Sequence, residues 1–316
     1  MREIRSPAGD AETRSCSPAT PRARRVAAGR PVLVLTLALA ACAGAVQDAG
    51  RPAVGPPNGT LILAGGGSLG PEIWARFVEL AGGPAARIVV IPTASERDSF
   101  PEDWGGLQRF REAGVADVRV LHTRDTTVAN TEAFVAPLRE ATGVWIPGGR
   151  QWRLADAYLG TRVLDELWAL LERGGVIGGT SAGASIQPSY MVRGAPEGNR
   201  IVMAEGHERG FGFLKDVAVD QHLITRGRER DLLSVIERYP DLLGIGLDEG
   251  TAIVVRGDTA EVIGRSKVAV YNAPAADDDA DDDAPYFWLE PGDRFDLAAR
   301  RVIERAGAPA PSPAGG

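Results

Sequence analysis

The chain has 316 residues, of which 44% are hydrophobic, enough to bury the core of one large or two small globular domains. Its net charge of −7 gives no general attraction to nucleic acid or to anionic lipid, so neither is expected as a partner of the folded region. The two cysteines, Cys16 and Cys42, precede the expected folded region, which argues against a disulfide or a thiolate metal site within it.

The N-terminal segment is expected to be an export signal. Several arginines precede an apolar run at residues 31–41, which is too short to span a bilayer. The run ends in Leu39-Ala40-Ala41-Cys42, which resembles the lipobox of bacterial lipoproteins, in which the cysteine is lipidated. We therefore expect residues 1–41 to be a signal peptide, Cys42 to carry a lipid, and residues 42–58 to form a flexible tether. The protein would then be exported and held at a membrane by its lipid alone.

Two alternatives exist for this segment. An ordinary A-x-A cleavage with an incidental cysteine would leave the protein without a lipid. The pair Arg24-Arg25 is compatible with twin-arginine export, but the apolar residues expected directly after such a pair are missing, so the general secretory route is favoured.

A glycine-rich turn follows the first expected strand, at residues 60–64. Residues 65–70 match the G-x-G-x-x-G pattern of dinucleotide-binding proteins. However, the second strand, at residues 87–91, ends in Pro92-Thr93-Ala94, without the acidic residue that would hold a ribose. We interpret the glycines as a tight turn, and no cofactor is expected.

Short runs rich in valine and isoleucine alternate with helical patterns further along the chain. This alternation predicts an α/β fold with a mostly parallel, doubly wound sheet and helices on both faces. Later short strands with tight turns predict a C-terminal antiparallel extension. The expected strands are residues 87–91, 118–121, 143–147, 175–178, 217–220, 245–247, 251–255, 261–263, 268–271, 286–289 and 295–297, and the expected helices are residues 71–80, 101–113, 131–141, 151–173 (broken near Gly160) and 229–239.

No internal repeat or linker divides this region, so residues 59–303 are expected to form one domain. Residues 273–284 contain a run of aspartates that repel one another and stay solvated, and the run lacks the glycine and final glutamate of an EF-hand calcium loop. Residues 304–316 are expected to be a disordered tail.

Ser181 is the candidate nucleophile. It lies in Gly179-Thr180-Ser181-Ala182-Gly183, which has the form G-x-S-x-G between an apolar run and a helix that could begin at residues 184–191. This is the pattern of a nucleophile elbow, in which small residues allow a tight turn from strand to helix. The helix would direct its N–H groups and positive end at the oxygen that becomes negative during acyl transfer. A closely packed turn without chemistry is the alternative.

A serine nucleophile needs a base and an acid to orient it. His222 is the best of the three histidines, because it directly follows a strand whose end is expected at the same edge of the sheet as Ser181. The acid is expected in Asp248-Glu249, at the end of another strand, with Glu197 as a further candidate. None of the histidines has a metal-ligand spacing, so no metal is expected.

Four separated motifs resemble one family. The elbow at Ser181, the segments Asp220-Gln221-His222 with Arg226-Gly227-Arg228, the segment at residues 246–252 and a closing segment at residues 291–297 are similar to those of cyanophycinases and aspartyl dipeptidases, which together form peptidase family S51. That resemblance implies a fold like the class I glutamine amidotransferase domain and a serine exopeptidase that acts on acidic or β-aspartyl peptides.

The resemblance also implies residue roles. Ser181 would be the nucleophile, His222 the base and Glu249 the orienting acid. The oxyanion hole would consist of the Ala182 N–H and one N–H from Gly148 or Gly149.

Substrate contacts are expected beside these residues. Guanidinium groups suit a substrate carboxylate because they bind it with two parallel hydrogen bonds, and Arg226 and Arg228 lie just after His222. The remaining candidates for substrate contacts are Gln151, Asp220 and Gln221. Two departures from the family pattern concern this pocket: Arg150 replaces the usual aspartate after the paired glycines, and Asp231 stands where a third arginine is usual.

The sequence therefore predicts an exported serine exopeptidase of the cyanophycinase type. It would cleave amide or isopeptide bonds in acidic or β-aspartyl peptides through an acyl-enzyme, with release of β-Asp-Arg from cyanophycin as one candidate reaction. The expected partners are the peptide substrate and, through the lipid, a membrane; a homodimer is compatible with the sequence. The alternatives are an α/β-hydrolase-type esterase, whose acid usually precedes its histidine, and a non-catalytic binding lipoprotein with the same fold.

Overall fold

The computed structural model describes residues 53–274 and 285–307. The expected signal peptide, Cys42 and the first part of the tether lie outside the described residues, as do most of the acidic segment and residues 308–316. No described helix combines the length and the apolar character needed to cross a membrane.

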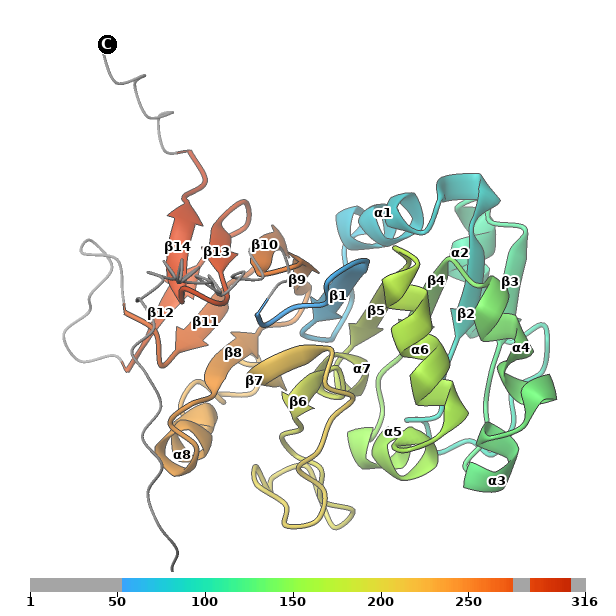
Figure 1. The fold of residues 1–316 in the computed structure, drawn as a ribbon. Helices are drawn as coiled ribbons and strands as arrows, with labels where there is room; N and C mark the ends of the chain where they lie inside the picture. Colours follow the sequence, from blue (N-terminus) through green and yellow to red (C-terminus); the bar gives the residue numbers. More distant parts are fainter. Residues whose placement is uncertain (1–52, 275–284, 308–316) are drawn as a thin grey trace, which may run out of the picture. The chain divides into compact units, whose positions relative to one another are not determined.

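The nine-stranded sheet has the order β14-β13-β10-β9-β1-β5-β4-β2-β3, with β1 at its centre (Figure 1). The half from β1 to β3 is parallel, and the half from β9 to β14 is antiparallel. The parallel strands are β1 (Thr60–Ala64), β2 (Arg87–Val90), β3 (Asp117–Val120), β4 (Gly143–Ile146) and β5 (Val176–Thr180); the antiparallel strands are β9 (Thr251–Arg256), β10 (Thr259–Gly264), β13 (Arg294–Asp296) and β14 (Arg301–Glu304).

A second sheet of five strands has the order β12-β11-β8-β7-β6. It consists of β6 (Pro188–Tyr190), β7 (Leu214–Gln221), β8 (Leu243–Leu247), β11 (Val268–Tyr271) and β12 (Tyr286–Leu289). Strands β6, β7 and β8 are parallel, whereas β11 and β12 pair antiparallel. The expected α/β fold with its antiparallel extension is thus confirmed, but the strands divide between two sheets.

The helices cover the sheets in layers, because alternate residues of each strand face opposite sides. On β1, Ile62 packs in a core with Phe77 and Phe110, on the side of α1 and α2. Leu61 and Leu63 face a larger core that contains residues of α4 to α6 and of the second sheet. A third core lies between the second sheet and α8 (Figure 1). The helices are α1 (Pro71–Leu80), α2 (Gln108–Glu112), α3 (Thr126–Ala129), α4 (Glu132–Glu140), α5 (Gln151–Tyr158), α6 (Arg162–Glu172), α7 (Ala182–Ser185) and α8 (Asp231–Arg238), with two 3-10 turns, Gly83–Ala85 and Gly105–Leu107.

Several of the predicted elements need correction. The helix expected at residues 101–113 is reduced to α2 and the 3-10 turn before it. The helix expected at residues 184–191 is instead the short α7 followed by β6, because the chain turns back to pair with β7. The short helix α3 and the last strand, β14, were not predicted.

The chain bonds to the domain near both ends of the described residues. Ala53, Val54 and Gly55 donate backbone hydrogen bonds to the carboxylate of Asp258, so residues 53–55 of the expected tether are bound to the domain. At the other end, the backbone N–H of Ala306 donates to Asp293 at 2.8 Å, beyond the expected start of the tail. Residues 53–55 and Ala306 are therefore bonded to the folded region.

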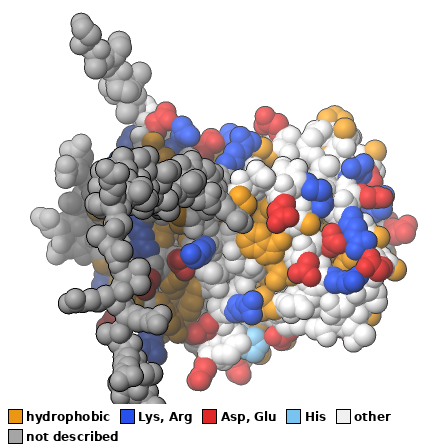
Figure 2. Space-filling model, in the orientation of Figure 1, with side chains coloured by type: hydrophobic (Ala, Val, Ile, Leu, Met, Phe, Trp, Pro, Cys, Tyr) orange, Lys and Arg blue, Asp and Glu red, His pale blue; other side chains and the backbone are white. Residues whose placement is uncertain are grey.

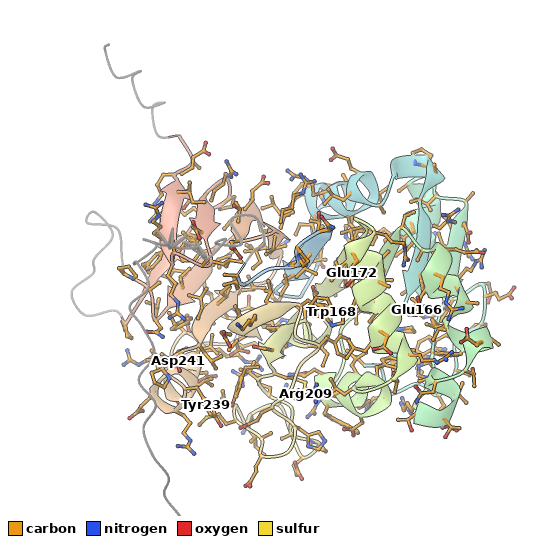
Figure 3. All side chains as sticks on the ribbon, viewed as in Figure 1. Glu166, Trp168, Glu172, Arg209, Tyr239 and Asp241 are labelled. Carbon is orange, nitrogen blue, oxygen red and sulfur yellow. The ribbon has the colours of Figure 1, made fainter. Side chains whose placement is uncertain are left out.

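The visible face carries acidic and basic side chains side by side (Figure 2). Helix α6 contributes Glu166, Trp168 and Glu172 to this face (Figure 3). The Trp168 ring meets Phe213 edge to face, with ring centres 5.0 Å apart, so it anchors α6 to the connection before β7.

Candidate active site

Ser181 lies at a tight turn between β5 and α7. Its backbone has φ 54° and ψ −114°, a region that residues other than glycine rarely adopt. The flanking glycines make this turn possible, because a Cβ at Gly179 would collide with the carbonyl oxygen of Gly183, and one at Gly183 with that of Ile146. The sequence pattern thus forms a strained elbow rather than an ordinary turn.

Backbone hydrogen bonds hold Ser181 in this conformation. Its N–H donates to the carbonyl of Ala64 at the end of β1 (2.9 Å), and its carbonyl accepts from Ala184 and Ser185. The strain is therefore balanced by contacts to the central strand and to α7. Because α7 has only four residues, the helix dipole that we expected here is small, and individual N–H groups must supply most of any stabilisation of negative charge.

The structure brings a hydroxyl, an imidazole and a carboxylate together in a line. The Oγ of Ser181 lies 2.9 Å from Nε2 of His222, and Nδ1 of His222 lies 2.5 Å from Oε1 of Glu249. We name these three residues the triad. Such a line is the geometry of a serine nucleophile with its base and its orienting acid.

The triad lies between the two sheets, which corrects one step of the sequence argument. Ser181 follows β5 of the nine-stranded sheet, whereas His222 follows β7 and Glu249 follows β8 of the second sheet. Strands β7 and β8 are parallel neighbours, so their carboxyl ends present His222 and Glu249 side by side. The three residues converge, but not at the edge of a single sheet.

The glycine turn after β1 holds the triad, a role that the sequence did not reveal. The backbone N–H of His222 donates to the carbonyl of Gly65, and that of Gly250 donates to Gly66. A Cβ at Gly66 would collide with the imidazole of His222, and one at Gly67 with the carboxylate of Glu249. The glycines that match a dinucleotide pattern therefore make room for the side chains of His222 and Glu249.

His222 is kept in its neutral form. Its side chain is only 8% exposed. Burial lowers its pKa below the usual value, and the charges of Arg226 and Arg228 lower it further, whereas Glu249 acts in the opposite direction. A neutral imidazole is the form that accepts a proton from a serine hydroxyl, so the site is ready for that step at neutral pH.

Of the three candidate acids, Glu249 is the one in contact with His222. Asp248 is buried and accepts hydrogen bonds from Thr225 and Ser266. Burial opposes its ionisation, but these hydrogen bonds keep its pKa below the usual value, so it stabilises the turn after His222. Glu197 is exposed on the connection between β6 and β7.

The residues expected to form an oxyanion hole lie next to Ser181. A Cβ at Gly148 would be 3.3 Å from the Cβ of Ser181 and 3.7 Å from its Oγ, so the backbone of Gly148 adjoins the hydroxyl. Ala182 begins α7, where a helix leaves its first N–H groups free of intrahelical bonds. Gly149 is further constrained, because a Cβ there would collide with the carbonyl of Ala94.

The five expected substrate contacts differ in their availability. Four of them are buried and bonded within the protein: Gln151 donates to the carbonyl of Val192, Arg228 donates to Gln221, and Asp220 pairs with Arg193. Arg226 is exposed, and none of the described residues forms a hydrogen bond or an ion pair with its side chain. Arg226 is therefore the first candidate for a contact with the substrate, and the other expected residues support it.

Arg193 is a site residue that the sequence analysis missed. It is 2% exposed, and its guanidinium binds both carboxylate oxygens of Asp220 at 2.7 Å and one of Asp231 at 2.6 Å. A single arginine after the apolar Met191 and Val192 gives no signal of this pairing. Asp231, one of the departures from the family pattern, thus has a partner within the chain.

The other two histidines lie away from the triad. His122 bonds to Thr93 (2.9 Å) and lines a cavity of about 710 Å³ beside the edge strand β3. His207 lies 3.1 Å from Asp156 on α5. Within residues 53–274 and 285–307, no group of three or more histidine, cysteine, aspartate or glutamate side chains is placed to hold a metal ion.

Comparisons with known proteins identify similar sequences. The family model of peptidase family S51 matches residues 61–263. The chain is 34% identical over 211 residues to a cyanophycinase from Geminocystis herdmanii, covering 65% of this chain and 76% of that protein. It is 36% identical over 223 residues to a cyanophycinase from Thermosynechococcus vestitus, covering 66% of this chain and 67% of that protein.

A solved structure shows a similar fold. The crystal structure of a peptidase from an acI-B1 Actinobacterium matches with a TM-score of 0.61 at 24% sequence identity, and the match covers 76% of this chain and 97% of that one.

Proposed function

Because this chain belongs to peptidase family S51 and is a serine-type peptidase of the cyanophycinase type, we propose that it is an exopeptidase that hydrolyses amide or isopeptide bonds in acidic or β-aspartyl peptides. The observation that carries this proposal is the line of hydrogen bonds from Ser181 through His222 to Glu249. Release of β-Asp-Arg from cyanophycin is one candidate reaction, supported by the similarity to cyanophycinases.

The reaction would proceed in two halves through an acyl-enzyme. Ser181 Oγ attacks the carbonyl carbon and gives its proton to Nε2 of His222, while Glu249 holds Nδ1 and stabilises the imidazolium. His222 then gives that proton to the leaving amine as the carbon–nitrogen bond breaks. Water attacks the acyl-enzyme with His222 as base, and the acid is released with Ser181 restored.

The negative oxygen of the tetrahedral intermediate would be bound by backbone N–H groups. The N–H of Ala182, together with that of Gly148 or Gly149, supplies the donors in this proposal. Each such donor typically contributes about 2.7–4 kcal/mol to the transition state of acyl transfer. The closeness of Gly148 to the nucleophile supports this role.

The acidic character of the substrate would be recognised by the basic turn after His222. The backbone N–H of Arg226 donates to the carbonyl of His222 at 3.0 Å, so its side chain starts one turn from the base. An exposed guanidinium at this position can bind a carboxylate with two hydrogen bonds. Arg228 is buried and supports this turn through its bonds to Gln221.

The proposal is tested by assaying β-Asp-Arg release from cyanophycin and the hydrolysis of Asp-X dipeptides, isoaspartyl dipeptides and a simple ester. Wild type is expected to hydrolyse acidic peptides, and Ser181→Ala to lose that activity. Ser234→Ala is a matched control, because Ser234 is an exposed serine on α8 whose hydroxyl bonds only to its own helix. Hydrolysis of the ester alone would indicate an esterase, and no turnover by wild type would indicate a binding protein.

We also propose that the protein is exported and anchored by a lipid at Cys42. The basic segment, the apolar run and Leu39-Ala40-Ala41-Cys42 support this proposal. Palmitate labelling in the native host should mark wild type but not Cys42→Ser. A Cys42→Ser protein that still fractionates with membranes would contradict it.

A further inference from the structure

A cavity with no assigned role lies next to the turn that follows His222. It has a volume of about 320 Å³ and is lined by two segments of the chain. One segment is the connection between β6 and β7, which contributes Arg193, Asn199 and Arg200. The other begins at the turn after His222 and includes Arg226. We name this cavity the arginine pocket.

The arginine pocket has more positive charge than its acidic residues neutralise. Four arginines line it, against one lining carboxylate, Asp231, and the buried Asp220 behind it. Arg193 binds both of those carboxylates. Among the described residues, no carboxylate accepts a hydrogen bond from the other three arginines. Arg228 bonds to Gln221 and lies 3.9 Å from Asp220.

Two of these arginines are open to a ligand. Arg200 and Arg226 are exposed, and neither has a side-chain hydrogen bond or ion pair with any residue that the structure describes. Burial lowers the pKa of Arg228, and the neighbouring charge of Arg193 lowers it further. The pocket is thus built to attract an anionic group, with one open guanidinium on each of its two walls.

The wall that carries Arg200 is held in place. The backbone N–H of Arg193 donates to the carbonyl of Val202, which closes the segment at its base, and Arg193 Nη1 donates to Asn199. Arg150 donates to the carbonyl of Ala195 at 2.5 Å. Both departures from the family pattern therefore act on this segment, Arg150 directly and Asp231 through Arg193.

The same two walls carry exposed apolar side chains. Ile201, next to Arg200, is 43% exposed, and Ile224, two residues before Arg226, is 40% exposed. They are two of only four large hydrophobic side chains that are exposed within the described ranges.

We propose that Arg200 is a specificity-determining residue that binds a second anionic group of the substrate, in addition to the group bound by Arg226. The preferred substrates are then acidic peptides with carboxylates on more than one residue. Arg193 and Arg150 are positioning residues that fix the segment from which Arg200 extends. This inference rests on the proposed function, because it places the ligand of the arginine pocket in the peptidase site.

The test compares two ligands that differ by one charge, β-Asp-Glu and β-Asp-Gln. Their dissociation constants are measured by calorimetry with full-length Ser181→Ala, which cannot turn them over, and with Ser181→Ala/Arg200→Gln. We expect Ser181→Ala to bind β-Asp-Glu about tenfold more tightly, the effect of one charged hydrogen-bonded contact, and Arg200→Gln to remove most of that preference. Arg209→Gln is the control, because Arg209 is exposed on the same connection (Figure 3) but does not line the pocket.

The outcomes separate this inference from the proposed function. Equal binding of both ligands by Ser181→Ala, a preference that survives Arg200→Gln, or an equal loss in Arg209→Gln would each overturn the role of Arg200. Turnover by wild type, measured separately, tests the peptidase proposal. A wild type that hydrolyses acidic peptides while Arg200→Gln keeps the charge preference would leave the peptidase intact and refute this inference alone.

Discussion

Gly66→Ala should disable the base without unfolding the domain. Gly66 has φ +112°, and a Cβ there would collide with the His222 ring. The ring must therefore move away from Ser181 Oγ, which it now meets at 2.9 Å. A displacement of about 1 Å at a reacting group can cost about 100-fold in rate, so we expect kcat to fall by about that factor.

Gly82→Ala separates this collision from backbone strain. Gly82 has φ +110°, almost the same as Gly66, but the nearest atom to an added Cβ is 3.9 Å away. Both variants should lose about 1–2 kcal/mol of stability from the strained backbone, measured by urea unfolding. Only Gly66→Ala should lose activity on an acidic peptide. Wild-type kcat in Gly66→Ala, or an equal loss in Gly82→Ala, would refute the role assigned to the glycine turn.

Three further predictions concern the triad and its support. The acid limb of the pH profile of kcat/KM should lie below about 6.5, because burial lowers the pKa of His222. Arg226→Gln should move this limb to higher pH, because it removes a positive charge that lowers the same pKa. A limb that does not move would contradict this. Glu249→Gln should lower kcat by about 10⁴, as the imidazole loses the carboxylate that orients it, with an unchanged melting temperature; near-normal kcat would exclude Glu249 as the acid. Arg193→Met should destabilise the fold by about 3–5 kcal/mol in chemical unfolding, because the fully buried Asp220 loses its main partner, and stability within 1 kcal/mol of wild type would contradict this.

Local patterns were enough to predict much of the fold. The alternation of apolar strands with amphipathic helices predicted β1 to β5 and helices α1, α4, α5 and α6 close to their observed bounds. The elbow at Ser181 was also visible, because its glycines are adjacent in the sequence and the constraint on them is local. Such features depend on neighbouring residues, which a sequence displays directly.

Features that depend on distant segments were not predicted. The division into two sheets depends on which strands pair, and β7 reads as an ordinary apolar strand whichever sheet it joins. The role of Gly66 depends on a histidine more than 150 residues away, so the same glycine pattern was compatible with an unrelated turn. Arg193 is an isolated charge in an apolar stretch until the structure places two aspartates beside it.

The central claim is that Ser181 forms an acyl-enzyme with His222 as its base. The most direct measurement is mass spectrometry of acid-quenched protein during turnover of an activated aspartyl substrate, with the modified peptide sequenced. We predict a single aspartyl group on Ser181 in wild type, with neither adduct nor turnover in Ser181→Ala. An adduct on another residue, or undiminished turnover in Ser181→Ala, would contradict the claim.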